Sequence, residues 1–130
     1  MQARVITRPV RVVCVDDQAV FRDAARAIID RTPHFELAGE AGDGRAALEL
    51  IEAEDPDLVI LDVRLPEIDG IEVSRRLSHR GSGPVVVLVS SADPRELSGL
   101  ARRCGAAALL RKHWLTPRLL HGLWVAHRRR

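Results

Sequence analysis

The 130-residue sequence has little of several residue types, and each shortage argues against a class of protein. Cys14 and Cys104 are its two cysteines, far apart and without a second pair, which argues against a disulfide framework or a zinc site. No apolar run approaches the roughly 18 residues of a membrane span, and residues Met1 to Thr7 lack the apolar stretch of a signal peptide. We therefore expect a cytoplasmic protein that does not bind membranes. The net charge of +2 is too small to indicate nucleic-acid binding, although Arg128, Arg129 and Arg130 form a basic C-terminal tip.

Lysine is the scarcest charged residue. Lys112 is the only lysine among 20 basic residues, and asparagine and tyrosine are absent. A genome biased toward arginine and alanine codons explains this composition. Alternatively, position 112 does not accept arginine. Composition alone leaves both explanations open.

What the chain does contain is typical of a globular α/β protein, with 46% hydrophobic and 29% charged residues. Its length predicts one domain over residues 1–130, with a core from about 10 to 127. Five short apolar runs are typical of strands. They are Val10–Val15, Phe35–Gly39, Leu58–Leu61, Val85–Val89 and Ala106–Leu110. Several are apolar throughout, which favours strands covered on both faces by helices.

Segments with helical spacing separate and follow these runs. Their apolar positions are Val20, Ala24, Ala27 and Ile28; Ala46, Ala47, Leu50 and Ile51; Ile71, Val73 and Leu77; Leu97, Leu100 and Ala101; and Leu119, Leu120, Leu123 and Trp124. Thr116-Pro117 is typical of a helix start, and Asp93-Pro94 of a turn. Strict alternation of strands and helices predicts a five-stranded parallel sheet with right-handed crossovers.

Polar residues follow four of the predicted strands where each one ends. They are Asp16 and Asp17, Asp62, Ser90 and Ser91, and Lys112. Taken singly, these are a helix cap, a strand end and a turn. In a parallel sheet, however, ligands bind at the carboxyl ends of the strands, where these residues meet. Two carboxylates about 4 Å apart repel by about 4 kcal/mol at an effective dielectric of 20, a cost that a divalent cation such as Mg²⁺ offsets.

The order and spacing of these motifs resemble the receiver domain of bacterial two-component response regulators. The motifs are Val15-Asp16-Asp17, Val59-Ile60-Leu61-Asp62, Leu65-Pro66 with Asp69-Gly70, Ser90-Ser91-Ala92, and Gly105-Ala106 leading to Lys112. The resemblance covers about residues 10–127. It implies a flavodoxin-like three-layer (βα)5 fold with strand order 2-1-3-4-5.

The resemblance also assigns roles to the residues at the strand ends. It implies that Asp62 is the phosphoacceptor and that Asp17 binds Mg²⁺ directly, with Asp16 assisting. The backbone carbonyl of Arg64, two residues after the phosphoacceptor, completes the protein ligands. Ser90 and Lys112 match the hydroxyl and the lysine that contact the phosphoryl group. Asp43-Gly44 is expected to be only a turn before the second helix.

Several positions depart from the family pattern. Leu109 replaces the aromatic residue that usually reports the switch, which puts its coupling to Ser90 in doubt. His113 replaces a proline that many members carry after the lysine, so the Lys112–His113 bond is either cis or trans. The side chain of Arg64 is expected to reach the phosphate, to pair with an acidic neighbour such as Glu67, or to stay solvated. Trp114 is expected to pack, or to become a contact residue if it is exposed.

Together these features predict a stand-alone receiver domain. It accepts a phosphoryl group on Asp62 from a histidine kinase or phosphotransfer protein, and is a switch, not a metabolic enzyme. Output passes to an unidentified protein, or to a homodimer, through the face formed by the fourth helix, the fifth strand and the fifth helix. Three alternatives remain: a pseudo-receiver that works without phosphorylation, a phosphohydrolase with an aspartyl nucleophile, and a fragment of a DNA-binding response regulator.

Overall fold

The computed structural model describes residues 8–93, 95 and 97–128. Met1–Thr7, Pro94, Arg129 and Arg130, for which the sequence made predictions, lie outside the described residues. The strands are β1 (Val10–Val15), β2 (Phe35–Ala41), β3 (Leu58–Asp62), β4 (Val85–Ser90) and β5 (Ala108–Arg111). The helices are α1 (Ala19–Asp30), α2 (Gly44–Glu54), α3 (Gly70–Ser78), α4 (Ser98–Arg103) and α5 (Pro117–His127), with a short 3₁₀ turn, η2 (Lys112–Trp114), between β5 and α5.

The five strands form one parallel sheet in the order β2-β1-β3-β4-β5. β1 pairs with β3 through Val15 and Leu61, and β3 pairs with β4 through Asp62 and Val89, so the carboxyl ends of these central strands lie side by side. All five residues of β3 are buried, as expected for a strand that helices cover on both faces. The predicted flavodoxin-like architecture and strand order are confirmed.

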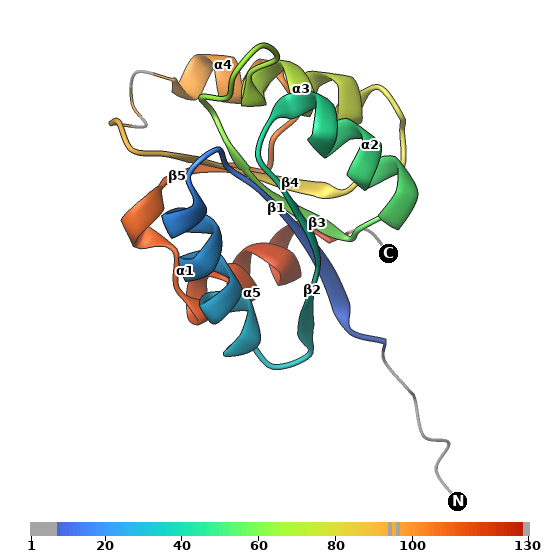
Figure 1. The fold of residues 1–130 in the computed structure, drawn as a ribbon, viewed down its shortest axis with the longest axis vertical. Coiled ribbons are helices and arrows are strands. Elements are labelled where there is room, and N and C mark those ends of the chain that lie inside the picture. The colour runs from blue at the N-terminus through green and yellow to red at the C-terminus, as the bar shows by residue number, and fades with distance from the viewer. Residues whose placement is uncertain (1–7, 94, 96, 129–130) are drawn as a thin grey trace, which may run out of the picture.

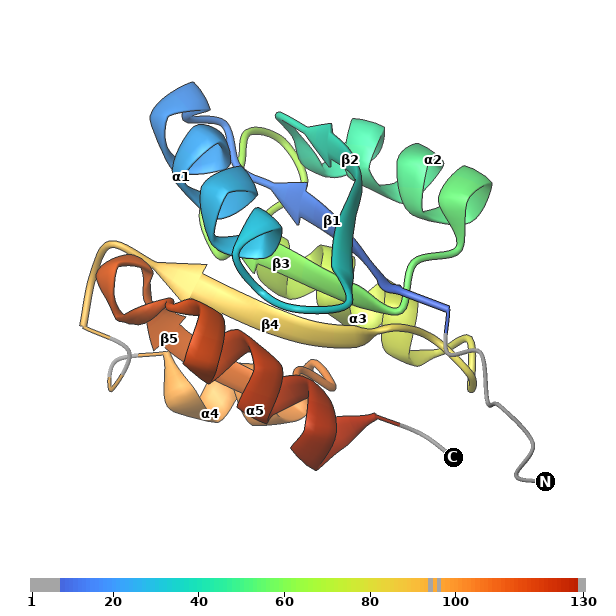
Figure 2. The same ribbon diagram turned by 90° about the horizontal axis from the view of Figure 1, so that it is seen from below.

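Helices cover the sheet in two layers, which Figures 1 and 2 show from two directions. One core lies between the sheet and α2, α3 and α4, and includes Leu61, Leu88 and Leu77. The other lies between the sheet and α1 and α5, and includes Ile60 and Leu120. Each fully buried aliphatic side chain stabilises the fold by about 1.5–3 kcal/mol relative to its exposed state. Two packed layers therefore hold the strand ends in fixed positions.

Side-chain caps set where three of the helices begin. Asp43 accepts a hydrogen bond from the Ala46 N–H at 2.8 Å at the start of α2, which confirms its structural role. Thr116 accepts one from the Leu119 N–H at 3.1 Å, and Pro117 occupies the first turn of α5. Such caps are typically worth about 1 kcal/mol each.

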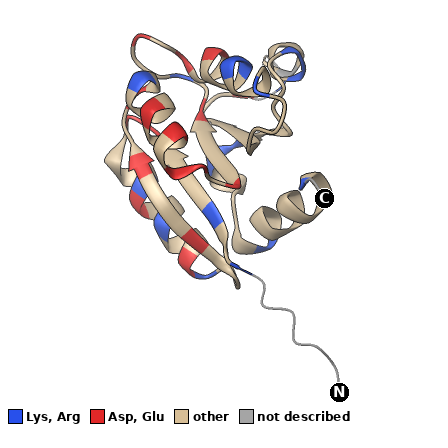
Figure 3. Cartoon of the chain, turned by 90° about the vertical axis from the view of Figure 1, so that its right-hand side faces the viewer, with Lys and Arg blue, Asp and Glu red and all other residues tan. Residues whose placement is uncertain are grey.

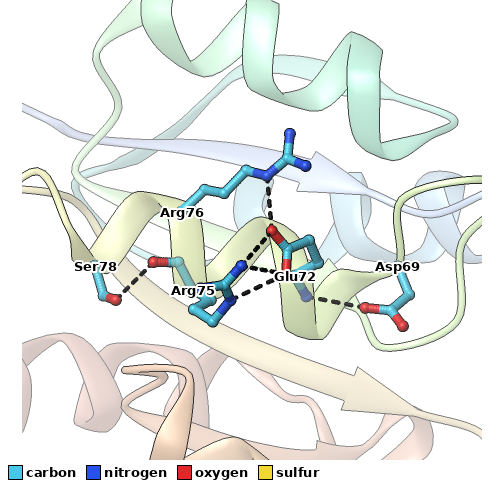
Figure 4. Close-up of polar contacts among 5 residues, drawn as sticks. All are labelled: Asp69, Glu72, Arg75, Arg76 and Ser78. Atoms are coloured by element: carbon cyan, nitrogen blue, oxygen red, sulfur yellow. Dashed lines mark hydrogen bonds and ion pairs between the residues drawn. The ribbon is translucent and has the colours of Figure 1, made fainter.

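The start of α3 is also capped, and its surface carries an ion-pair cluster (Figure 4). Asp69 accepts a hydrogen bond from the Glu72 N–H at 2.9 Å. The carboxylate of Glu72 in turn pairs with Arg75 and Arg76, each at 2.8 Å. The acid lies in the first turn and the two cations in the last, the arrangement that the helix dipole favours.

Three sequence predictions differ from the structure. α1 buries Phe21, Ala25 and Ile29, whereas Val20 of the predicted apolar series is 82% exposed. β2 continues past Gly39 to Ala41, because its pairing with β1 shifts register between Val12 and Val13 and then resumes. β5 begins at Ala108 rather than Ala106. The residue before it, Ala107, donates its N–H to the Val86 carbonyl of β4 at 2.8 Å.

None of the helices in the described part of the chain has the length and apolar character that a membrane crossing requires.

Candidate functional site

The polar residues predicted to meet at the strand ends do meet there. A cleft of about 430 Å³ opens at this edge of the sheet. It is lined by Asp17, Gln18, Asp62, Arg64, Ser90, Ser91, Ala92 and Lys112. Asp16 lies directly beside it, with its carboxylate 2.6 Å from the Lys112 ammonium.

Three carboxylates converge at this cleft. One ligand atom each from Asp16, Asp17 and Asp62 lies within 4.8 Å of the other two. Asp62 is the last residue of β3 and is 6% exposed, whereas Asp17, which directly follows the buried Asp16, is exposed. The group therefore combines buried and open oxygen ligands, a donor set suited to a hard divalent cation that keeps part of its water shell.

The buried Asp16 is held in place by backbone contacts. Its N–H donates to the Ala41 carbonyl at 3.0 Å, and its Oδ1 accepts from the Gln18 N–H at 2.8 Å. Its carbonyl accepts from the Arg22 guanidinium at 2.6 Å. The other carboxylate oxygen, Oδ2, accepts no hydrogen bond within the described part of the chain, although the ammonium of Lys112 is close to it. This buried oxygen is therefore held by its ion pair with Lys112.

Lys112 enters the site from η2, which directly follows β5. Its Nζ is 2.6 Å from Asp16 Oδ2 and 3.4 Å from Asp62 Oδ2, and it lies 4.9 Å from the centroid of the Phe21 ring. The described residues include no cis peptide bond, so the Lys112–His113 bond is trans. The single lysine of the chain therefore supplies the positive charge between two buried carboxylates.

The surroundings of Asp62 raise the pKa of its carboxyl group. Burial is the main cause, and the neighbouring charge of Asp16 acts in the same direction. The Lys112 ammonium and the Arg64 N–H, which donates to Asp62 Oδ1 at 3.2 Å, oppose this shift without cancelling it. The ionised form of Asp62 is therefore held at a free-energy cost that additional positive charge would relieve.

Lys112 shows the complementary behaviour. Burial acts to lower the pKa of its ammonium, but the contacts with Asp16 and Asp62 outweigh burial and raise the pKa above its usual value. The lysine is therefore fully charged at neutral pH.

The remaining predicted site residues lie around the cleft. Ser90 is 2% exposed at the end of β4, and its Oγ accepts a hydrogen bond from the Ala92 N–H at 3.0 Å. The side chains of Ser91 and Arg64 line the cleft and form no hydrogen bond or ion pair within the described residues. Of the alternatives for Arg64, pairing with Glu67 is therefore not formed. Leu109, at the position that is aromatic in much of the family, packs against the core below.

The residues for which the sequence predicted no catalytic or metal-binding role lie outside the site. His113 and Trp114 follow Lys112 and are exposed, Trp114 by 48%, so Trp114 is a candidate contact residue. The ring centroid of His121 lies 6.4 Å from that of Phe35, and His121 does not line the cleft.

Sequence reasoning missed two supporting residues. Phe21 underlies the Lys112 ammonium, and α1 was assigned the wrong buried face. Gly70 lies so close to β3 that a Cβ there would be 2.0 Å from the Asp62 carbonyl oxygen. The signal for Gly70 was present in the Asp69-Gly70 motif, whose physical reason is this close backbone approach.

Comparisons with known proteins agree with this geometry. The family model "Response regulator receiver domain" matches residues 12–123. The chain is 39% identical over 119 residues to the transcriptional regulatory protein PdtaR of Mycobacterium tuberculosis, covering 91% of this chain and 57% of that protein. It is 38% identical over 113 residues to a protein-glutamate methylesterase/protein-glutamine glutaminase of Anaeromyxobacter dehalogenans, covering 86% of this chain and 30% of that protein. The chain thus spans about half or less of the length of these relatives.

Solved structures give the same result. The signal receiver domain of the putative response regulator NarL from Mycobacterium tuberculosis matches with a TM-score of 0.81 at 34% identity, over 90% of this chain and 98% of that one. The response regulator domain of CheB from Thermotoga maritima matches with a TM-score of 0.80 at 28% identity, over 92% of this chain and 96% of that one. With the family model matching most of its length, this chain belongs to the response regulator receiver domain family of two-component signalling.

Proposed function

We propose that this receiver domain accepts a phosphoryl group on Asp62 and uses the modification to change its binding to a partner. The observation that carries the proposal is the position of Asp62. Its carboxylate lies at the mouth of the cleft between the acidic pair and the single lysine.

In the proposed transfer, a carboxylate oxygen of Asp62 attacks the phosphorus of a phosphohistidine on a sensor kinase or phosphotransfer protein. The new P–O bond forms as the P–N bond breaks, and the electron pair of that bond returns to the imidazole. The Arg64 N–H orients Asp62 through Oδ1, and the Lys112 ammonium compensates charge on the phosphoryl oxygens. Ser90 accepts its hydrogen bond from Ala92 and therefore keeps its own proton to donate to a phosphoryl oxygen.

Receiver domains bind Mg²⁺ at an acidic pocket, and the residues of this site fit that ion. The fit rests on the three converging carboxylates, which form an all-oxygen donor set of buried and exposed ligands. We assign the carboxylates of Asp16, Asp17 and Asp62 and the backbone carbonyl of Arg64 as the ligands. When bound, Mg²⁺ supplies positive charge against the carboxylates and the incoming phosphoryl group.

Phosphorylation is proposed to shift a two-state equilibrium. A phosphoryl group on Asp62 competes with Asp16 for the Lys112 ammonium and draws on the hydroxyl of Ser90. Ser90 ends β4, which pairs with β5, and Lys112 directly follows β5, so the α4–β5–α5 side is the proposed site of output to an effector protein. The transcriptional and methylesterase relatives are longer than this chain, and their whole-protein activities are not transferred to it.

The test is incubation with Mg²⁺ and acetyl phosphate, followed by intact-mass analysis. We expect gain of one phosphoryl group, loss of that gain in Asp62→Ala and on chelation of Mg²⁺, and no loss in the matched control Asp23→Ala, an exposed carboxylate of α1. Lack of phosphorylation in the wild type, together with partner binding that does not change with beryllofluoride, would support a phosphorylation-independent interaction module instead. Steady turnover of a small phosphomonoester, abolished in Asp62→Ala, would support a phosphohydrolase.

A further inference from the structure

The peptide group that joins Asp16 to Asp17 has a single hydrogen bond within the described residues. Nη1 of Arg22 donates it to the Asp16 carbonyl oxygen at 2.6 Å. The N–H of the same peptide group belongs to Asp17, and it has no partner in the described part of the chain. Arg22 therefore makes the polar contact that fixes the plane of this peptide.

The direction of the Asp17 side chain depends on that plane. Asp16 is also fixed by its own N–H and by both oxygens of its carboxylate, each of which has a partner. Asp17 is exposed, and its carboxylate forms no hydrogen bond or ion pair within the described residues. Of the three converging carboxylates, that of Asp17 is thus the one that only its backbone holds in place.

A second contact orients the guanidinium of Arg22 itself. Arg22 lies on α1, and its Nε is 3.3 Å from Oε1 of Glu40 on β2. The two side chains are 25% and 20% exposed, so water and salt screen this pair less than a fully exposed one. A planar guanidinium has donors in fixed directions, so Arg22 can pair with Glu40 through Nε and hold the Asp16 carbonyl through Nη1 at the same time.

The neighbouring cation Arg26 provides a comparison within the same helix. It follows Arg22 by one turn of α1 and pairs with the other carboxylate oxygen of Glu40, but it forms no hydrogen bond with Asp16. Figure 3 shows basic and acidic residues interspersed over much of the chain, so an ion pair alone indicates no function. The hydrogen bond to the backbone between two candidate metal ligands distinguishes Arg22 from Arg26.

We propose that Arg22 is a positioning residue for the divalent cation. It holds the Asp16–Asp17 peptide in the orientation that keeps the Asp17 carboxylate near Asp62 and at the cleft. This inference rests on the proposed function, in which Asp17 is a Mg²⁺ ligand. Mg²⁺ demands near-ideal octahedral geometry, whereas Ca²⁺ accepts flexible arrangements of its oxygen ligands. A fixed Asp17 therefore favours Mg²⁺ over Ca²⁺.

The charge of Arg22 and its positioning role act on the cation in opposite directions. A guanidinium beside the acidic group repels a divalent cation, so removing the charge alone would strengthen Mg²⁺ binding. Loss of positioning would weaken Mg²⁺ binding, since partners that orient metal ligands are typically worth about 10- to 100-fold in metal affinity. The sign of the change in affinity therefore separates the two roles.

The experiment measures Mg²⁺ and Ca²⁺ affinities by NMR titration of backbone amides in wild type, Arg22→Met and Arg26→Met. Methionine keeps an unbranched apolar stem but removes the charge and the donors. We expect Arg22→Met to weaken Mg²⁺ by about tenfold and Ca²⁺ by about threefold or less. The matched control Arg26→Met removes one charge from the same helix and the same ion-pair cluster, and should stay within about twofold of wild type for both ions. Circular dichroism and thermal unfolding verify that each variant is folded.

A measurement without metal separates this inference from the proposed function. The backbone ¹⁵N order parameter of Asp17 in metal-free protein should fall from about 0.85 toward 0.6 in Arg22→Met and stay unchanged in Arg26→Met. Failure of the wild type to bind Mg²⁺ would refute the metal assignment of the proposed function, and the order parameter would then decide alone whether Arg22 positions Asp17.

Four results would overturn the inference. These are Mg²⁺ binding by Arg22→Met that equals or exceeds that of wild type, equal weakening by Arg26→Met, parallel loss of Mg²⁺ and Ca²⁺ affinity, and an unchanged order parameter of Asp17.

Discussion

Replacing Lys112 by methionine tests the electrostatic design of the site. Methionine has a similar length but no charge, so Lys112→Met removes the cation that lies 2.6 Å from Asp16 and 3.4 Å from Asp62. Asp16 is fully buried and Asp62 is 6% exposed, so water cannot replace the missing ammonium around these carboxylates without a rearrangement.

The size of the effect follows from these distances. At an effective dielectric of 20, the ammonium attracts the Asp16 carboxylate by about 6 kcal/mol and the Asp62 carboxylate by about 5 kcal/mol. Desolvation of the three ions offsets most of this attraction in the folded protein, but removal of one partner leaves the desolvation of the others uncompensated. We expect Lys112→Met to lower the free energy of unfolding by about 3 kcal/mol at pH 7 in Mg²⁺-free buffer. For a chain of this size that corresponds to roughly 10 °C in Tm.

Urea unfolding of four proteins measures this coupling: wild type, Lys112→Met, Asp16→Asn and the double variant. The double variant should be more stable than additivity predicts by at least about 1 kcal/mol, because Asp16→Asn removes the charge that Lys112→Met leaves unpaired. Added MgCl₂ should stabilise Lys112→Met more than wild type. The control is Arg111→Met, the adjacent cation, whose contact to Asp93 at 4.0 Å is partly exposed and should matter by less than about 1 kcal/mol. A loss below about 1 kcal/mol for Lys112→Met, or additive single variants, would refute the reasoning.

Lys112→Arg separates charge from shape at the same position. A broad planar guanidinium keeps the charge but replaces a compact ammonium, so this variant should fold and yet respond poorly to beryllofluoride. A normal response would mean that position 112 accepts arginine, and codon bias would then be the better explanation of the composition.

Three further predictions concern other parts of the site and the surface. Burial raises the pKa of Asp62, so ionising it costs stability as pH rises through that pKa. Asp62→Asn should therefore equal or exceed wild-type stability in Mg²⁺-free buffer at pH 7, and clear destabilisation in chemical unfolding would contradict this. Hydrogen bonds from Arg95 lower the pKa of Asp93 to about 2. The stability from this pair should be present above pH 4 and lost as pH falls toward 2, so the Tm difference between wild type and Asp93→Asn should close over that range, and an NMR titration midpoint near 4 would count against it. Gly70→Ala should lose more than about 3 kcal/mol of stability, because its Cβ would meet the Asp62 carbonyl at 2.0 Å, whereas Gly122→Ala in the open part of α5 should be neutral or stabilising by thermal unfolding.

The sheet and the site were predictable because their signals are local and mutually consistent. The apolar runs at β3 and β4 are short and rich in β-branched residues, which favours strands. Their polar ends place Asp62 and Ser90 at the same edge once the strands are parallel. The strand order came from the resemblance to the receiver family. Periodicity alone does not decide which strands are neighbours, because any crossover helix can reach more than one position in the sheet.

The helix faces were less predictable, for a physical reason. α1 is rich in alanine, which fits on either side of a helix, so Val20-Ala24-Ala27-Ile28 and Phe21-Ala25-Ile29 are almost equally good apolar series. Burial of the large Phe21 ring under the Lys112 ammonium favours the second series, and that contact spans 91 residues of sequence. No periodicity in a local window reports such a contact.

The distribution of charge along the chain shows a different kind of failure. Its signal, a run of 34 residues (97–130) without a carboxylate, was fully present in the sequence but was lost in the average charge of the chain. Some acidic residues outside this run have partners in the fold: Asp43 caps α2, Glu72 pairs with Arg76, and Asp16 and Asp17 lie near Asp62. Within the described residues, four arginines of this run form no ion pair (Arg102, Arg103, Arg118 and Arg128), and the same holds for Arg31, Arg45, Arg64 and Arg80 outside it. Because a parallel α/β fold places consecutive segments side by side, a division of charge along the sequence becomes a division of charge over the surface, which the net charge does not report.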